Sequence, residues 1–195
     1  MEQPFQPLPG PSLRLRWPYF APTYVTTHPL ELDPKWLYER GVRGIIFDFD
    51  NTLISSHGHE IGDGRAALLE RCIRTFGAEH IVIVSNKLRV FGLANKLDEE
   101  AARFGIKAIS TGVVVKPFRR ALRLAMEHIK LPVGEVLMVG DLLLTDILGG
   151  KRMGMQTLLV APVHAPERFG IKTLRTIERL LLGYHAPKEG TSPTR

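Results

Sequence analysis

The sequence predicts an α/β fold of the three-layer, doubly wound type, with five core strands in one parallel sheet. Short runs of branched apolar residues alternate along the chain with longer segments of helical periodicity, which is the pattern of repeated strand–helix–strand units. The apolar runs lack the polar alternation of a half-exposed strand, so we expect helices on both faces of the sheet. A chain of 195 residues is expected to form a single domain.

The predicted elements follow one another with short connections. Strands are expected at residues 45–47, 81–84, 106–109, 136–139 and 157–160, and helices at residues 34–40, 63–76, 90–104, 117–129, 143–149 and 174–182. Asp33 followed by Pro34 is a typical start for the first helix. We interpret Gly149-Gly150 as a helix stop and not as a phosphate loop, because the G-x-G spacing is missing. The last helix is amphipathic, with an apolar face formed by Leu174, Ile177, Leu180 and Leu181.

Composition and the terminal segments narrow the class of protein. We expect a flexible N-terminal arm at residues 1–16, one domain at 17–185 and a flexible tail at 186–195, with the aromatic residues 17–24 packed on the domain edge. The single Cys72 excludes an internal disulfide and a cysteine metal cluster. No apolar run is long enough to span a bilayer and no secretory signal is evident, so we expect a cytoplasmic protein that at most associates peripherally with a membrane. The net charge of +6 permits an anionic partner and selects none.

Polar residues stand at the ends of three predicted strands. The first strand leads into Asp48 and Asp50, the second into Ser85-Asn86 and the fourth into Gly140-Asp141. Because the carboxyl ends of parallel strands share one edge of a sheet, these side chains are expected to meet in one crevice, together with Lys116 at a helix start. Carboxylates at the mouth of a buried strand are costly unless a cation or hydrogen bonds compensate them. The pattern therefore predicts a functional site at this edge.

Each of these features also has an ordinary structural interpretation. Asp50-Asn51 could form an Asx-turn, Ser85-Asn86 a plain strand-end turn, Lys116 a solvated side chain and Asp146 part of an exposed helix. We favour the functional interpretation because the features occur together and in one order.

That order resembles the motif order of the haloacid dehalogenase (HAD) superfamily of phosphotransferases. The motifs are Asp48-Phe49-Asp50-Asn51-Thr52, Ser85-Asn86, Lys116, and Gly140-Asp141 followed by Asp146. More narrowly, the chain resembles the capless IIIA phosphatases of the bacterial YqeG type, which are related to mitochondrial phosphatidylglycerophosphate phosphatase. This second resemblance is carried by Gly44-Ile45-Ile46, Lys116-Pro117, residues 145–150, Gly154-Met155-x-Thr157 and the Arg-x-x-Glu-Arg of residues 175–179.

The resemblance implies a Mg²⁺-dependent phosphatase that forms an aspartyl-phosphate. Asp48 would be the nucleophile and a metal ligand, and Asp50 the general acid and base and, through its backbone carbonyl, a second ligand. Asp141 would bind the metal directly, and Asp146 would orient the ligands.

The same resemblance implies a set of groups around the phosphoryl group. Ser85 and Lys116 would hold it during transfer. Asn51, Thr52, Asn86 and Lys87 would contact the substrate. Lys87 and Leu142 differ from the residues usual in relatives, which leaves the identity of the substrate open. We interpret His57 and His59 as ordinary loop residues in preference to substrate contacts.

The short intervals on either side of Ser85 leave no room for a cap domain, so the crevice should admit a bulky substrate such as a macromolecule or a lipid head group. The resemblance implies dephosphorylation of phosphatidylglycerophosphate at a membrane surface.

One alternative is a non-catalytic regulatory or binding module on the same fold. Another, a nucleic-acid end phosphatase, is disfavoured because no aromatic residues interleave with a basic tract. A response-regulator receiver domain is disfavoured by Asp50, the acid/base that permits turnover. The oligomeric state stays open.

Overall fold

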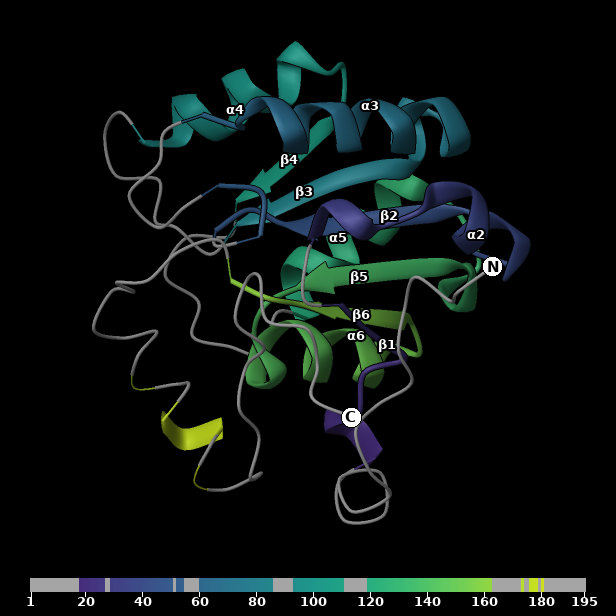
Figure 1. Ribbon diagram of the computed structural model, residues 1–195, viewed down its shortest axis with the longest axis vertical. Coiled ribbons are helices and arrows are strands. Elements are labelled where there is room, and N and C mark those ends of the chain that lie inside the picture. The colour runs from purple at the N-terminus through teal and green to yellow at the C-terminus, as the bar shows by residue number, and fades with distance from the viewer. Residues whose placement is uncertain are drawn as a thin grey trace.

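A computed structural model describes residues 18–26, 29–50, 52–54, 60–85, 93–110, 119–162, 173, 176–178 and 180. Among these residues, six strands form one parallel sheet in the order β1-β6-β5-β2-β3-β4 (Figure 1). The strands are β1 (Tyr24–Thr26), β2 (Gly44–Asp48), β3 (Ile81–Ser85), β4 (Lys107–Ser110), β5 (Val136–Gly140) and β6 (Gln156–Val160). The strand order places β2 between β5 and β3, so the three strands that carry the predicted site are neighbours.

The helices that connect the strands are α2 (Pro34–Glu39), α3 (Asp63–Phe76), α4 (Leu93–Arg103), α5 (Arg119–Ile129) and α6 (Leu148–Met153). Short 3-10 turns are η1 (Pro18–Phe20), η2 (Pro29–Glu31), η3 (Ala78–His80) and η4 (Val133–Glu135), and η5 (Leu143–Ile147) is a π-helical turn. The first helix begins as the sequence predicts, because the Asp33 side chain accepts hydrogen bonds from the backbone N–H groups of Lys35 and Trp36.

Helices cover both faces of the sheet, which makes three layers. Along β2, Ile45 and Phe47 pack in a core with residues of α2, α3 and α4, whereas Ile46 packs in a second core with residues of α5. This alternation follows from the two-residue period of a strand. All five residues of β2 are buried, as expected for a strand covered on both faces. The predicted fold class is confirmed.

The five predicted strands are present as β2 to β6, and the structure adds a sixth. β1 lies at the edge, paired in parallel with β6, and begins at Tyr24, the last residue of the segment that we expected only to pack there. Reciprocal hydrogen bonds hold this edge: the Thr23 N–H donates to Thr157 Oγ1 and the Thr157 N–H donates to Thr23 Oγ1, both at 3.0 Å. A three-residue strand is too short to produce a detectable sequence period.

The interpretation of Gly149-Gly150 as a helix stop is wrong. Both residues lie inside α6, which ends at Gly154 in the left-handed conformation with φ of 86°. A Cβ at Gly150 would lie 2.8 Å from Thr157 Cγ2 and 3.1 Å from Met138 Cβ. The glycine is therefore explained by the close approach of α6 to the sheet.

The segment with the predicted last helix is helical at the described residues 173, 176–178 and 180. The two described residues of its expected apolar face, Ile177 and Leu180, have relative exposures of 36% and 73% and are not buried. Glu178, between them in the sequence, is only 1% exposed. Leu174 and Leu181 lie outside the described residues. Among the described helices, none has the length and apolar character needed to cross a membrane.

Candidate active site

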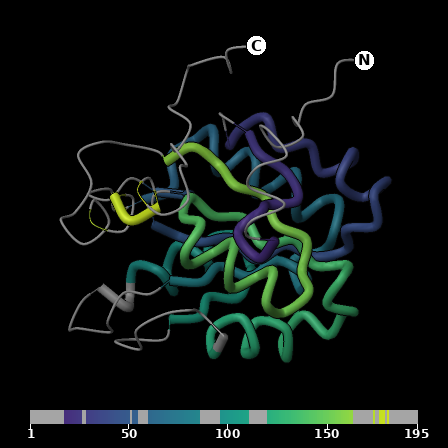
Figure 2. Tube along the Cα trace, turned by 90° about the horizontal axis from the view of Figure 1, so that it is seen from below, coloured from purple at the N-terminus to yellow at the C-terminus, as the bar shows by residue number. Residues whose placement is uncertain are grey.

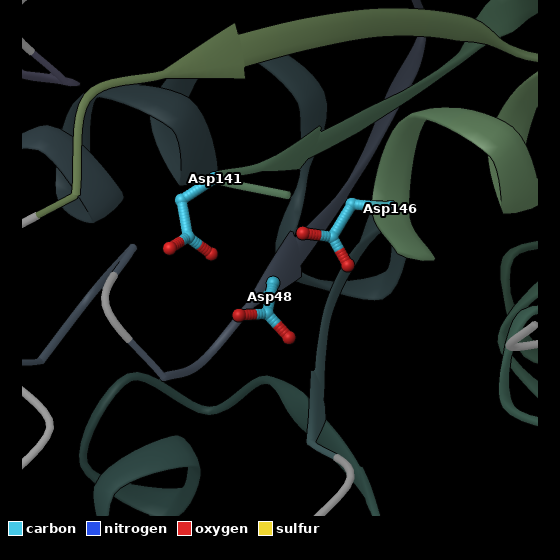
Figure 3. A group of neighbouring side chains, drawn as sticks. All are labelled: Asp48, Asp141 and Asp146. Atoms are coloured by element: carbon cyan, nitrogen blue, oxygen red, sulfur yellow. The ribbon is translucent and has the colours of Figure 1, made fainter. Parts of the chain in front are cut away.

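Three aspartates converge at the carboxyl ends of the two central strands. Asp48 is the last residue of β2, Asp141 directly follows β5, and Asp146 lies in the π-helical turn η5. Each offers a carboxylate oxygen within 4.8 Å of the others. Figure 3 shows the three carboxylate side chains gathered in one place, each from a different segment of the chain. Because β2 and β5 are paired in parallel, their ends lie side by side, and the turn after β5 brings Asp146 back to the same place.

The three carboxylates are deeply buried, with relative exposures of 6% for Asp48, 2% for Asp141 and 1% for Asp146. Like charges at this separation and burial repel strongly unless a cation or a shared proton compensates them. Carboxylate oxygens are the ligands that hard divalent cations prefer. The donor set therefore fits a divalent metal ion.

The turn after β5 is shaped by Asp146 itself. Its Oδ2 accepts a hydrogen bond from the Leu142 N–H at 3.0 Å, and its Oδ1 accepts one from Thr145 Oγ1 at 2.9 Å. Asp146 also packs directly on Gly140, where any Cβ would overlap its carboxyl group. The last residue of β5 must therefore be glycine for Asp146 to reach the cluster.

Asp50 and Ser85 form a second contact beside the acidic cluster. Ser85, the last residue of β3, is 1% exposed, and its Oγ donates to Asp50 Oδ2 at 3.1 Å. The chain turns sharply after β2: the Phe49 N–H donates to the Val84 carbonyl, and the Ile54 N–H returns to the Phe49 carbonyl. This turn carries the Asp50 carboxylate back to the end of β3.

Thr52 lies in the same turn and is 1% exposed. Its Oγ1 has no hydrogen-bond partner within the described part of the chain, and its carbonyl accepts from Arg65 Nε of α3 at 3.1 Å. A buried hydroxyl of this kind fits the predicted contact to substrate, since buried polar groups are normally paired. The anchoring by Arg65 was not predicted, because its sequence pattern does not distinguish it from a surface arginine.

Several predicted residues lie outside the described part of the chain. They are Asn51, Asn86, Lys87 and Lys116, together with His57 and His59 of the loop after β2. The structure therefore brings together Asp48, Asp141 and Asp146, and separately Asp50 and Ser85.

Besides Arg65, sequence reasoning missed the roles of two residues that shape the site. The first is Gly140, which we interpreted only as part of a strand end. The second is Glu178, whose Oε1 accepts a hydrogen bond from the Leu144 N–H in η5 at 2.9 Å. The Arg-x-x-Glu-Arg pattern around Glu178 was the available signal, but a contact across 34 residues cannot be derived from it.

A parallel sheet with an acidic cluster at the ends of its central strands is the arrangement expected of a HAD-type phosphatase, and the comparisons with known proteins agree. The sequence model of the family described as mitochondrial PGP phosphatase matches residues 18–164. The chain belongs to this family and is a phosphatase.

Two relatives show the extent of the likeness. The probable phosphatase YqeG of Bacillus subtilis is 34% identical over 171 residues, which cover 84% of this chain and 90% of the relative. Phosphatidylglycerophosphate phosphatase 1, chloroplastic/mitochondrial, of Arabidopsis thaliana is 32% identical over 158 residues, 77% of this chain but only 44% of the plant protein.

A solved structure is similar in fold. An uncharacterized protein from Listeria monocytogenes matches with a TM-score of 0.50 and 17% identity, over 66% of this chain and 85% of that one. At this identity the match supports the fold alone.

Proposed function

We propose that the protein is a Mg²⁺-dependent phosphomonoester hydrolase that works through an aspartyl-phosphate on Asp48, with phosphatidylglycerophosphate as substrate. The observation that carries the proposal is the buried cluster of Asp48, Asp141 and Asp146, whose oxygens lie within 4.8 Å of one another. Asp48 and Asp141 would be metal ligands, and the backbone carbonyl of Asp50 a further one. Bound Mg²⁺ would neutralise the repulsion between a phosphate dianion and the carboxylates.

Asp146 is better suited to orienting than to binding the metal. Both of its oxygens already accept hydrogen bonds, from the Leu142 N–H and from Thr145 Oγ1. These hydrogen bonds fix the turn that follows Asp141. Residues that orient metal ligands without binding the metal act in this way.

The nucleophile is a carboxylate oxygen of Asp48. It attacks phosphorus, the bond from phosphorus to the ester oxygen breaks, and the departing oxygen takes a proton from the Asp50 carboxyl group. Water then attacks the phosphorus of the acyl phosphate and gives its proton to the Asp50 carboxylate, which releases inorganic phosphate and restores Asp48. The hydrogen bond from Ser85 Oγ supports this assignment, because it places the Asp50 carboxyl group at the end of β3, beside the acidic cluster.

Substrate contacts complete the proposal. Thr52 Oγ1, a buried hydroxyl, would donate to the phosphoryl group. Ser85 would exchange its Asp50 contact for a phosphoryl oxygen, and Lys116 would hold the charge of the transferring group. Asn51, Asn86 and Lys87 would line the entrance on the basis of their positions in the motifs.

Three observations support a lipid phosphate as the substrate. The curated plant relative is a phosphatidylglycerophosphate phosphatase by name. The intervals between β2 and β3 and between β3 and α5 are short, which favours an uncapped site open to a bulky head group. The net charge of +6 permits an anionic partner and is compatible with an anionic membrane surface. We place the activity in a single domain at residues 17–185, in the cytoplasm and peripheral to the membrane.

The test is phosphate release from phosphatidylglycerophosphate in mixed micelles, with and without Mg²⁺, beside p-nitrophenyl phosphate and a 3′-phosphorylated DNA oligonucleotide. We expect Mg²⁺-dependent release from the lipid far above that from DNA. Mg²⁺-dependent release from p-nitrophenyl phosphate alone would retain the mechanism and reject the lipid. Preference for the DNA would establish the nucleic-acid phosphatase instead.

A further inference from the structure

A buried carboxylate lies outside the acidic cluster. Glu178 belongs to the late helical segment, defined by the described residues 173, 176–178 and 180. It is 1% exposed, while Ile177 and Leu180 are 36% and 73% exposed. A segment that buries its glutamate and exposes its apolar neighbours inverts the usual preference of these residues. Burial of a carboxylate is costly unless hydrogen bonds compensate it, so the contacts of Glu178 must account for its placement.

One such contact reaches the active site. Glu178 Oε1 accepts a hydrogen bond from the Leu144 N–H at 2.9 Å. Leu144 lies in η5, between Asp141 and Asp146. In Figure 1 the yellow helical segment lies on the left, the side toward which the arrows of the central strands point, and Figure 2 shows it on the same side of the molecule.

The Glu178 carboxylate provides a hydrogen-bond acceptor for an N–H group that has none within the turn η5. N–H groups in the first turn of a helix have no acceptor within the helix. In η5, Asp146 Oδ2 supplies an acceptor for the Leu142 N–H, and Glu178 Oε1 supplies one for the Leu144 N–H. A hydrogen bond to a carboxylate is stronger than one between neutral groups. Two carboxylates therefore fix the turn that carries two of the three clustered aspartates.

We propose that Glu178 is a positioning residue for the metal site: by holding the Leu144 N–H it keeps Asp141 and Asp146 aimed at Asp48. The proposal rests on the proposed function, since it assumes that the cluster binds Mg²⁺. It predicts that the late helical segment contributes to metal affinity without contributing a ligand. Groups that orient metal ligands typically change affinity by about 10- to 100-fold when removed.

The test is Mg²⁺ binding to the full chain, measured by isothermal titration calorimetry, with Mg²⁺-dependent activity as a second readout. Glu178→Ala should weaken Mg²⁺ binding by about tenfold or more. Glu178→Gln retains an oxygen that accepts the Leu144 N–H, and should keep affinity within about threefold of wild type. Glu178→Asp shortens the side chain by one methylene group, which withdraws the carboxylate from the Leu144 N–H, and should weaken Mg²⁺ binding. This variant still tests the proposal if Glu178→Ala fails to fold.

Glu100 provides a matched control. It is also a buried glutamate, 6% exposed, and its Oε2 accepts a backbone hydrogen bond from the Ile61 N–H at 3.0 Å, outside the turn at 141–146. Glu100→Ala should lower the unfolding temperature and leave Mg²⁺ affinity unchanged.

The outcomes separate this inference from the proposed function. If wild type binds Mg²⁺ and Glu178→Ala or Glu178→Asp binds it equally well, the positioning role is overturned. Equal loss in Glu178→Gln and Glu178→Ala would also overturn it, because the acceptor oxygen would not be the cause. If wild type binds no Mg²⁺, the proposed metal site itself fails.

Discussion

Gly140 and Asp146 are packed so closely that any side chain at position 140 would occupy the space of the aspartate's carboxyl group. The glycine at the end of β5 is therefore required by the packing of Asp146, six residues further along the chain. The contact links the end of a central strand to the third carboxylate of the acidic cluster.

We predict that Gly140→Ala damages the site more than the fold. The added methyl group must displace Asp146, which would release the Leu142 N–H and misalign Asp141. Mg²⁺ affinity should fall by about tenfold or more, as measured by calorimetry. Gly134→Ala is the control, because a Cβ at Gly134 meets no atom within 4 Å. Unchanged Mg²⁺ affinity in Gly140→Ala would show that Asp146 does not need its observed position.

The contact between Ser85 and Asp50 gives a second prediction. Ser85→Ala removes the hydroxyl group that contacts Asp50 and that would donate to a phosphoryl oxygen once substrate is bound. It should lower kcat by about tenfold or more, since a hydrogen bond to a charged phosphoryl group is worth about 1.5–3 kcal/mol. Steady-state kinetics on p-nitrophenyl phosphate measures the effect. Ser110 is the matched control, because it pairs with Ser85 in the register of β3 and β4. If Ser110→Ala and Ser85→Ala lower kcat equally, the effect is one of strand packing.

The close approach of α6 to the sheet predicts a cost in stability. Gly150→Ala would press a methyl group against Thr157 Cγ2, and should lower the free energy of unfolding by about 1–3 kcal/mol in urea denaturation. Adding Thr157→Ser removes Cγ2 and retains the hydroxyl group that accepts from Thr23, so it should recover part of the loss. A double variant no more stable than Gly150→Ala would contradict this explanation.

The convergence of the acidic residues at one edge of the sheet could be predicted from the sequence, because it depends on the geometry of parallel strands. Asp48 and Asp141 end apolar runs that only buried parallel strands explain, and such strands share an edge, so their convergence was predictable. The contact between Asp50 and Ser85 follows from the same logic, because β2 and β3 are neighbours.

The contacts that sequence reasoning missed depend on packing between distant segments. The burial of Glu178 depends on how a late helix docks, and its apolar neighbours Ile177 and Leu180 indicated the opposite face. Gly150 has the sequence signature of a helix end, yet its role depends on a close contact with Thr157. Neither hydrophobic periodicity nor turn-residue rules can predict such contacts between segments far apart in the sequence.

Cys72 should be inert in the folded protein. Burial raises the pKa of its thiol from an ordinary value of 9.0 to about 12. A thiol reagent at about pH 8 should therefore modify the denatured protein rapidly and leave the native protein and its activity intact. Because the folded pKa is raised, this thiol contributes stability that is complete below about pH 9 and is lost as the pH rises toward about 12. Rapid modification of the native protein would contradict this burial.

The covalent role of Asp48 is the centre of the proposed mechanism. Rapid acid quenching of the enzyme with ³²P-labelled phosphatidylglycerophosphate and Mg²⁺ tests it most directly, with Asp48→Asn as the control. We predict a protein-bound label that forms within the first turnover, is released by hydroxylamine and is absent from Asp48→Asn. Mg²⁺-dependent turnover with no hydroxylamine-labile label, or a label that persists in Asp48→Asn, would contradict nucleophilic attack by Asp48.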